Sequence, residues 1–294
     1  MNNSFGFKSL HPAVCFLYYI GLIVINTVFI HPYFLLMALL SAILLNFFHN
    51  QGKEIRKGAK FYIFISVVIL IINPLFSHRG ATILFYLFDQ PITLESIMFG
   101  FLMMLSIVTI LISFLSFNNI ISEDKFIYLF SSFAPKTALL IMMAFRFVPL
   151  LKRRLKAITN VQKTRGISLR SGTIKQRAKA GISILFILMT WSLEEALQTA
   201  DSMKARGYGL GKRSSYYVYR FYKQDVFFLI WFSLLLVTIV LQGVLGFGKL
   251  EIYPQLEALG LSNGDNYLFI LVLLFLFTPH LIEGREYFKW HLSK

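Results

Sequence analysis

Two arginines stand out because each is followed by glycine where a long helical pattern ends. Arg165 lies in QKTRGI and Arg206 lies in SMKARGYG, a spacing of 41 residues (206 minus 165). Their neighbours are small in both copies: Thr164 and Gly166 in the first, Ala205 and Gly207 in the second. A guanidinium group keeps its charge and can hold a carboxylate through two parallel hydrogen bonds. The chemistry that these positions offer is therefore carboxylate binding that does not depend on pH.

A purely structural interpretation of the same residues stays open. Glycine after the last helical turn supplies a left-handed C-cap, and a nearby arginine complements the negative end of the helix dipole. Either copy alone fits this interpretation. The recurrence at the ends of two long helices favours a further role, because capping residues are chemically interchangeable and a cap does not need the same arginine twice.

Two long helical patterns must position these arginines. The first runs from Pro135 to Arg165, where apolar TALLIMMAFRFVPLL gives way to KRRLKAITNVQKTR. The second runs from Thr173 to Arg206, where a basic start leads through ISILFILMTW to polar SLEEALQTADSMKA. Each helix would be roughly 45 to 50 Å long at 1.5 Å per residue. Both are too polar at one end to be ordinary membrane spans.

The first of these helices is expected to lie along the membrane interface. Arg146 sits in its apolar half, and placing an arginine side chain at the centre of a bilayer costs roughly a few kcal/mol or more. We therefore expect Arg146 to face protein or the interface. Pro149 removes a backbone donor and should kink the helix. The pattern predicts a bent helix that is apolar toward the membrane and basic toward the cytosol.

The composition places the whole chain in a membrane. Hydrophobic residues make up 56% of the 294 and charged residues only 15%, and the mean hydropathy is +0.66. This composition is far from that of a soluble globular protein. The net charge of +15 fits cytosolic loops that face anionic lipid, so it does not indicate nucleic acid. Cys15 is the single cysteine, and the six histidines lack metal-ligand spacing, which argues against disulfides and metal clusters.

Six apolar runs have the length of spanning helices: 13–30, 32–48, 60–77, 97–117, 226–247 and 266–283. The shorter run from Ala81 to Phe88 is interpreted as a re-entrant or interfacial piece. Basic residues orient the spans. Four of them, Lys53, Arg56, Lys57 and Lys60, mark the second link as cytosolic, whereas the links with Arg79 or Lys249 alone are assigned outside. Both termini are then cytosolic, and the chain is expected to be a multi-pass protein of the cell membrane.

These features together resemble a known family, the transmembrane T component (EcfT/CbiQ-like) of energy-coupling factor (ECF) transporters, which import vitamins and metal ions. The resemblance covers most of the chain. It rests on NPLFSHRG (73–80), FDQPITLESIMFG (88–100), FRFVPLL (145–151) and the two x-Arg-x ends. Thr164 departs from the family pattern, in which alanine or serine is commoner.

The resemblance implies a non-catalytic scaffold. Arg165 and Arg206 would each dock in a groove of one of two ABC-type ATPase subunits and pair with an acidic residue there. A separate substrate-binding membrane (S) subunit would carry the vitamin or metal ion, and ATP would be bound by the partners, so no cofactor is expected in this chain. The implied fold is all-α, with about six transmembrane helices and a cytosolic domain of long coupling helices. Its parts are residues 1–117 (four spans), 118–224 (coupling domain) and 225–294 (two spans).

The chain shows no convincing nucleotide site of its own. The stretch from Gly243 to Lys249 fits G-x-x-x-x-G-K, but Leu250 replaces the serine or threonine that a phosphate-binding loop requires. The basic residues are concentrated elsewhere in the chain, because the segment from Lys125 to Lys223 holds 19 of the 29. Energy for transport would therefore come from partner subunits.

Two other classes of function stay open. A secondary transporter lacks an obvious coupling group, because Asp89 and Glu95 are assigned to an outer loop and no acidic residue lies mid-span. A membrane-embedded enzyme could use Glu194, Glu195 and Asp201 as carboxylates near the membrane. These three also fit a solvated helix face that complements the basic neighbouring helix, and this interpretation is favoured.

Overall fold

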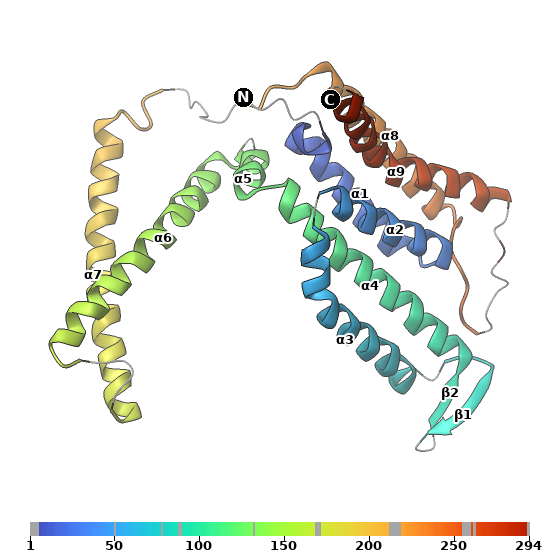
Figure 1. The fold of residues 1–294 in the computed structure, drawn as a ribbon, viewed down its shortest axis with the longest axis horizontal. Coiled ribbons are helices and arrows are strands. Elements are labelled where there is room, and N and C mark those ends of the chain that lie inside the picture. Colours follow the sequence, from blue (N-terminus) through green and yellow to red (C-terminus); the bar gives the residue numbers. More distant parts are fainter. Residues whose placement is uncertain are drawn as a thin grey trace. The chain divides into compact units, whose positions relative to one another are not determined.

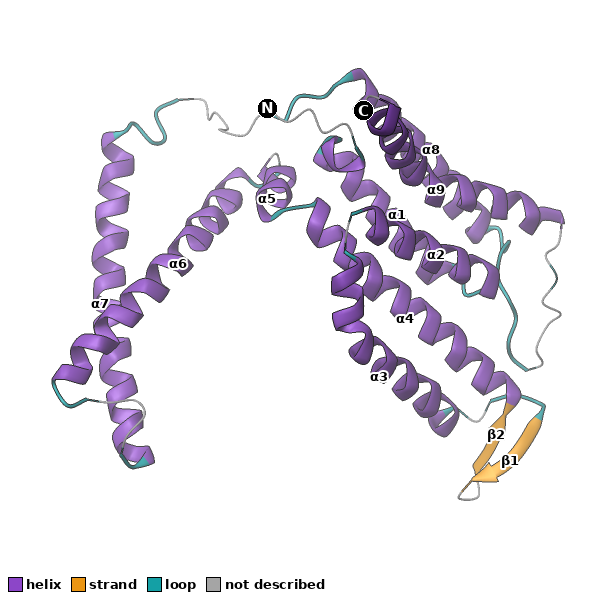
Figure 2. Ribbon diagram, in the orientation of Figure 1, coloured by secondary structure: helices purple, strands orange, loops and turns teal. Residues whose placement is uncertain are grey.

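A computed structural model describes residues 6–49, 51–77, 79–87, 90–131, 133–167, 172–211, 219–254, 260 and 263–292. Helices dominate this part of the chain (Figures 1 and 2). They are α1 (Pro12–Val28), α2 (Pro32–Phe48), α3 (Gly52–Phe76), α4 (Leu94–Ile120), α5 (Glu123–Ser131), α6 (Pro135–Thr164), α7 (Ile174–Ala205), α8 (Lys223–Val244) and α9 (Asn263–Leu292). A short 3-10 helix (Phe7–Ser9) and a hairpin of β1 (Ile83–Leu87) and β2 (Gln90–Thr93) complete the fold. The prediction of an all-α membrane protein is confirmed.

The chain forms two compact units. One comprises Met1–Phe126 and Tyr219–Lys294, and the other comprises Ile127–Val218. The first unit contains α1 to α4, α8 and α9, and the second contains α6 and α7. The assignment of residues 1–117 and 225–294 to the membrane and of 118–224 to the cytosol stays a prediction.

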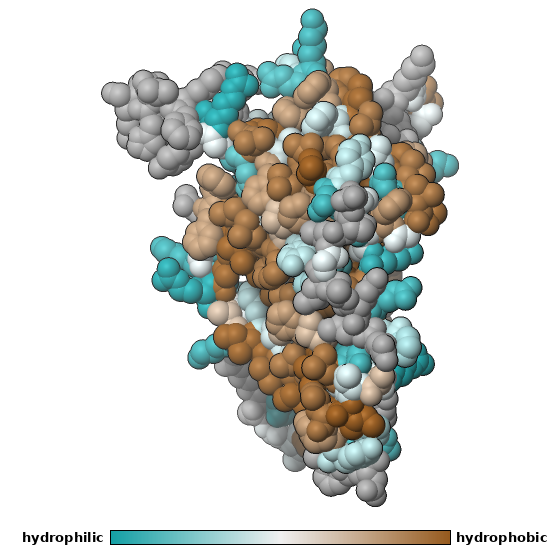
Figure 3. Space-filling model, turned by 90° about the vertical axis from the view of Figure 1, so that its right-hand side faces the viewer, coloured by the Kyte–Doolittle hydropathy of each residue, from teal (hydrophilic) through white to brown (hydrophobic). Residues whose placement is uncertain are grey.

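Each of the six predicted spans forms a helix. Among the described residues, five helices are long and apolar enough to cross a membrane: α3, α4, α7, α8 and Gly264–Arg285 within α9. The count differs from the prediction in two ways. First, α1 and α2 are apolar but only 17 residues long. Second, α7 was not among the predicted spans but is long enough to span, because its apolar middle extends into polar ends. Hydrophobic side chains also lie on the surface (Figure 3), as helices that face lipid require.

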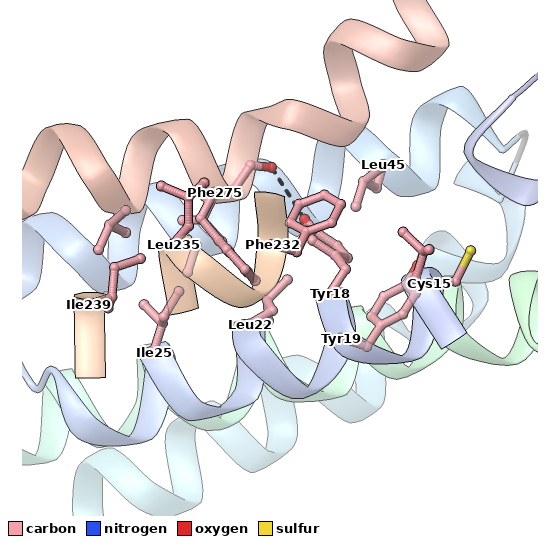
Figure 4. Packing of buried hydrophobic residues seen from close by; sticks show 14 of the residues in the cluster. Cys15, Tyr18, Tyr19, Leu22, Ile25, Leu45, Phe232, Leu235, Ile239 and Phe275 are labelled. Atoms are coloured by element: carbon pink, nitrogen blue, oxygen red, sulfur yellow. Dashed lines mark hydrogen bonds between the residues drawn. The ribbon is translucent and has the colours of Figure 1, made fainter. Parts of the chain in front are cut away.

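The core of the first unit is formed by side chains of α1, α2, α8 and α9, together with the end of α4 (Figure 4). Tyr18 stacks on Phe275 with ring centroids 5.6 Å apart, and its hydroxyl donates to the carbonyl of Leu276 at 3.2 Å. Gly21 permits this approach, because a Cβ there would lie 2.2 Å from the ring of Phe275. The absence of a side chain at Gly21 therefore allows α1 and α9 to pack closely.

Polar side chains join α4 to the first two helices. The amide of Asn26 donates to the hydroxyl and carbonyl of Ser106 at 2.9 Å, and the amide of Asn46 donates to the carbonyl of Ile112 at 3.0 Å. Both asparagines are fully buried. Hydrogen bonds of this kind stabilise contacts between helices inside a membrane, where water is not available as a partner.

The segment before α4 differs from the prediction. The run from Ala81 contributes β1, which pairs antiparallel with β2 and places Ile83 opposite Thr93. Phe88 and Asp89 lie outside the described residues. Glu95 was assigned to an outer loop, but it lies in the first turn of α4 and is only 1% exposed. One of its carboxylate oxygens accepts the backbone N–H of Thr82 at 3.1 Å, which holds the hairpin against the helix.

Gly80 provides a test of this packing. Its φ of +140° is rarely adopted by other residues, and a Cβ would lie 2.5 Å from a carboxylate oxygen of Glu95 and 2.8 Å from the hydroxyl of Thr93. We expect Gly80→Ala to lower the free energy of unfolding by roughly 1 to 3 kcal/mol, measured by unfolding in detergent. Gly284→Ala is the control, because open space surrounds Gly284 and alanine favours helix. Equal stability of the two variants would contradict the packing described for Glu95.

Candidate functional site

The two helices that carry the arginines begin and end where their capping residues require. Thr173 starts α7 with a capping box, in which its hydroxyl accepts the N–H of Gln176 at 3.4 Å and the Gln176 side chain accepts the N–H of Thr173 at 3.0 Å. Pro135 starts α6 at the position that needs no backbone donor. Both helices end at the residue before an arginine, with Arg165 and Arg206 as C-caps.

The two C-terminal caps have the same geometry. At the end of α6, Gly166 donates to the carbonyl of Lys163 at 3.1 Å, and Ile167 donates to that of Gln162 at 2.9 Å. At the end of α7, the same two bonds run from Gly207 to Lys204 at 2.9 Å and from Tyr208 to Met203 at 3.0 Å. Gly166 and Gly207 both have a φ of +78°. Each end is a complete Schellman motif, which presents its arginine from the same backbone shape.

A third helix shows that this cap does not need arginine. At the end of α8, Gly246 donates to the carbonyl of Gly243 and Phe247 donates to that of Gln242 at 3.1 Å. The φ of Gly246 is +95°. Leu245 occupies the C-cap position that arginine occupies in α6 and α7. Capping therefore explains the glycines but not the two arginines.

The side chains of both arginines are available for binding. Arg165, Arg206 and their small neighbours Thr164, Ala205 and Gly166 are exposed, and Gly207 is half-buried. The hydroxyl of Thr164 donates to the carbonyl of Val161 at 2.7 Å, so it belongs to the helix end. Across the described ranges, no carboxylate forms an ion pair with either arginine. An external carboxylate would thus meet an uncompensated guanidinium.

The helices α6 and α7 cross near their middles. Trp191 of α7 stacks against Phe147 of α6 with ring centroids 6.3 Å apart. The guanidinium of Arg154 lies 4.6 Å from the centre of the Trp191 ring, which is a cation–π contact. Sequence reasoning missed this crossing, because nothing in either helical pattern fixes where the two helices meet.

Beyond the crossing point, the first half of α6 and the second half of α7 border a groove of about 510 Å³. Its lining residues are Leu139, Met142, Met143 and Arg146 from α6, and Glu195, Gln198, Thr199, Ser202, Met203 and Arg206 from α7. The groove brings Arg206 into one site with Arg146 and Glu195. The lining residues of each helix recur at helical spacing, so the sequence indicates which face of each helix they share. The sequence does not indicate that these two faces lie against each other.

The two arginines themselves are not brought together. Arg206 lies beside residues 139 to 146 of α6, whereas Arg165 caps the far end of that helix. The separation along α6 is 19 to 26 residues (165 minus 146 and 165 minus 139), or roughly 30 to 40 Å. The structure therefore offers two separate arginine sites, not one composite site.

The carboxylates proposed for a membrane-embedded enzyme do not form a cluster with other reactive groups. Glu194 and Asp201 are exposed on α7, and only Glu195 lies in the groove. Within the part of the chain that the structure describes, no three His, Cys, Asp or Glu side chains gather as metal ligands. The solvated helix face remains the simpler interpretation of these residues.

Arg146 supplies a test of the groove. Its side chain is exposed and makes no ion pair among the described residues, so Arg146→Leu should leave folding intact, with a change in unfolding free energy within roughly 0.5 kcal/mol. Arg154→Leu is the matched variant on the same helix, and it should cost more because it removes the contact with Trp191. Thermal unfolding in detergent compares the two. Complete loss of folded protein for Arg146→Leu would show that Arg146 belongs to a buried ionic pair.

Comparisons with known proteins give a consistent result. The sequence model of a family described as "Cobalt transport protein", CbiQ, matches residues 7–217. The chain is 39% identical over 89 residues to an energy-coupling factor transporter transmembrane protein EcfT of Leuconostoc gelidum, which covers 30% of this chain and 33% of the relative. It is 40% identical over 99 residues to an EcfT of Lactobacillus helveticus, covering 33% of this chain and 36% of the relative.

A longer alignment joins the chain to an EcfT of Exiguobacterium sibiricum. The two are 28% identical over 171 residues, which covers 54% of this chain and 64% of the relative. In the first two alignments the chain spans only about a third of the relatives' length. Local similarity to proteins of this name is therefore clear.

Proposed function

Because the chain belongs to the CbiQ family, described as cobalt transport protein, we propose that it is the transmembrane scaffold of an energy-coupling factor importer. In this role it binds two ABC-type ATPase subunits and transmits their ATP-driven motion to a substrate-binding membrane subunit. The names of its relatives, energy-coupling factor transporter transmembrane protein, support this proposal. The chain itself is then a non-catalytic subunit, and ATP binds to the partners.

One observation carries the proposal: two exposed arginines occupy identical Schellman caps, and a third cap of the same geometry does without arginine. Arg165 and Arg206 each offer a planar guanidinium to a carboxylate in a groove of one ATPase subunit. Their separation of roughly 30 to 40 Å along α6 suits two binding sites on two subunits. Thr164, Gly166, Ala205 and Gly207 keep the approach to each arginine open.

The cargo of the importer is a vitamin or a metal ion. The family description names cobalt, and the relatives' names give no cargo. In the proposed mechanism the separate membrane subunit selects the cargo, so this chain needs no substrate pocket of its own. Two subunits that hydrolyse ATP and one that binds cargo complete the complex.

Co-purification tests the proposal against its alternatives. The tagged chain, extracted from its native membrane in mild detergent, should bring down two ATPase subunits and one small membrane protein. A secondary transporter or a membrane-embedded enzyme would be purified without ATPase subunits. Mass spectrometry identifies the partners, and the membrane partner's bound molecule names the cargo.

The basic residues of the loops predict the orientation of the chain in this role. Tags at Lys57, at Arg170 and at the C-terminus should be cytosolic, and tags at Gly80 or Gly264 should be outside, because the basic links face the cytosol. Arg170 lies outside the described residues. Labelling of intact cells with an impermeant reagent, followed by labelling after permeabilisation, measures this. A tag at Arg170 that reacts in intact cells would overturn the orientation.

A further inference from the structure

One face of α6 carries two kinds of exposed side chain in sequence. Ile141, Phe145 and Val148 are 42 to 48% exposed, and the same stripe continues with the exposed Lys152, Lys156 and Lys163, with the partly exposed Thr159 between the last two. At 100° per residue these seven positions fall within an arc of about 80°. Phe147 and Arg154, which contact Trp191 of α7, point roughly the opposite way. The stripe is therefore the face of α6 that α7 leaves uncovered.

The charge around this stripe has one sign. Residues 125–193 contain 13 lysines and arginines and no aspartate or glutamate. Thus none of the lysines on the stripe has an acidic neighbour on α6 or on the first half of α7. An excess of positive charge beside exposed aromatic and aliphatic side chains is typical of surfaces that bind anionic membranes.

We propose that this stripe of α6 is a binding surface for anionic phospholipid, with Ile141, Phe145 and Val148 in the acyl layer and Lys152, Lys156 and Lys163 at the phosphates. The stripe extends over 22 residue steps (163 minus 141), or roughly 33 Å, so an inclined helix crosses from the acyl layer to the headgroups. Along this line the apolar side chains come first and the lysines follow, which matches the order of the acyl chains and the phosphates in one leaflet.

The choice of basic residue separates this surface from the helix ends. All three cations on the stripe are lysines, whose flexible stems bring point charges to phosphates, whereas both helix ends use arginine, whose planar fork holds a carboxylate or a phosphate through two parallel hydrogen bonds. The surface goes beyond the proposed docking of ATPase subunits and does not depend on it.

Lipid titration of the purified full-length chain tests this surface. Apparent affinities for phosphatidylglycerol and phosphatidylcholine are measured by native mass spectrometry for three proteins: the wild type, Lys152→Gln/Lys156→Gln and Lys175→Gln/Lys179→Gln. The first double variant should bind phosphatidylglycerol roughly tenfold more weakly, with phosphatidylcholine unchanged. The second removes the same charge from the exposed start of α7 and should change either affinity less than about twofold. Equal losses in both variants, or no loss in the first, would overturn the proposal.

A depth measurement gives an independent result. The native Cys15 is buried, so a nitroxide attached to Phe145→Cys or Lys163→Cys labels one position in each variant. In nanodiscs with phosphatidylglycerol, the label at 145 should be accessible to oxygen and the label at 163 to a water-soluble relaxant. Equal exposure of both labels to water would overturn the surface. So would a Lys152→Gln/Lys156→Gln variant that releases the ATPase subunits yet keeps its preference for phosphatidylglycerol, since the stripe would then bind protein.

Discussion

Reversal of both arginines, Arg165→Glu with Arg206→Glu, is expected to abolish ATP-dependent uptake while the chain still inserts and folds. If each arginine pairs with a carboxylate of an ATPase subunit, as proposed, each reversal replaces a charge-assisted pair by repulsion, and loss of such a pair costs roughly 2 to 5 kcal/mol. Each site should then bind its ATPase subunit at least about 30-fold more weakly. Uptake into vesicles and the affinity of purified ATPase subunits measure the two consequences. Arg→Ala at one end should leave a complex that assembles but couples poorly.

Two controls separate docking from capping. Leu245→Glu places the same acid at the same cap position of α8, so it reproduces the unfavourable charge at a helix C-terminus. Lys204→Glu makes the same change in charge two residues before Arg206. Both controls should retain uptake close to that of the wild type. Loss of uptake in either control to the level of Arg206→Glu would show that general charge or cap stability, not the arginine, is responsible.

Removal of the Asp225 carboxylate is expected to cause the largest loss of stability. Asp225 is 3% exposed, and its two oxygens accept the backbone N–H groups of His11 and Tyr222, each at 2.9 Å. It thereby joins the start of α1 to the start of α8. Asp225→Ala leaves one buried donor and one partly buried donor without this acceptor, and we expect the free energy of unfolding to fall by roughly 2 to 4 kcal/mol, measured by unfolding in detergent.

Asp225→Asn and Glu54→Ala complete this experiment. In Asp225→Asn, the amide that replaces the carboxylate can accept one N–H but presents a donor to the other, so an intermediate loss of stability is expected. Glu54 pairs with Lys57 on the surface of α3, where both side chains are more than half exposed, so Glu54→Ala should change stability little. An Asp225→Ala variant as stable as Glu54→Ala would refute the role given to Asp225.

The sequence predicted the site helices closely because their ends carry strong local information. The start and stop signals of these helices act within one helical turn: Pro135, Thr173 with Gln176, and the glycines after both arginines. Both α6 and α7 therefore begin and end within one residue of the predicted bounds. The apolar runs likewise became helices. These features depend on neighbours in sequence, which a sequence displays directly.

Other features depend on contacts between distant segments, and the sequence did not reveal them. The crossing at Trp191, and with it the groove that joins Arg146 to Arg206, follows from packing of two helices. The bond between Asp225 and His11 spans 214 residues. The hairpin was missed because ILFYL, read alone, is only a short apolar run, and its pairing with the segment before α4 makes it a strand.

The number of ATPase subunits bound to each variant tests the central claim most directly. Complexes purified through a tag on this chain are weighed intact, for the wild type, Arg165→Glu, Arg206→Glu and the double reversal. If each arginine docks one subunit, the wild type holds two ATPase subunits, each single reversal loses the subunit at its own end, and the double reversal holds none. A double reversal that keeps both ATPase subunits would show that Arg165 and Arg206 are only helix caps.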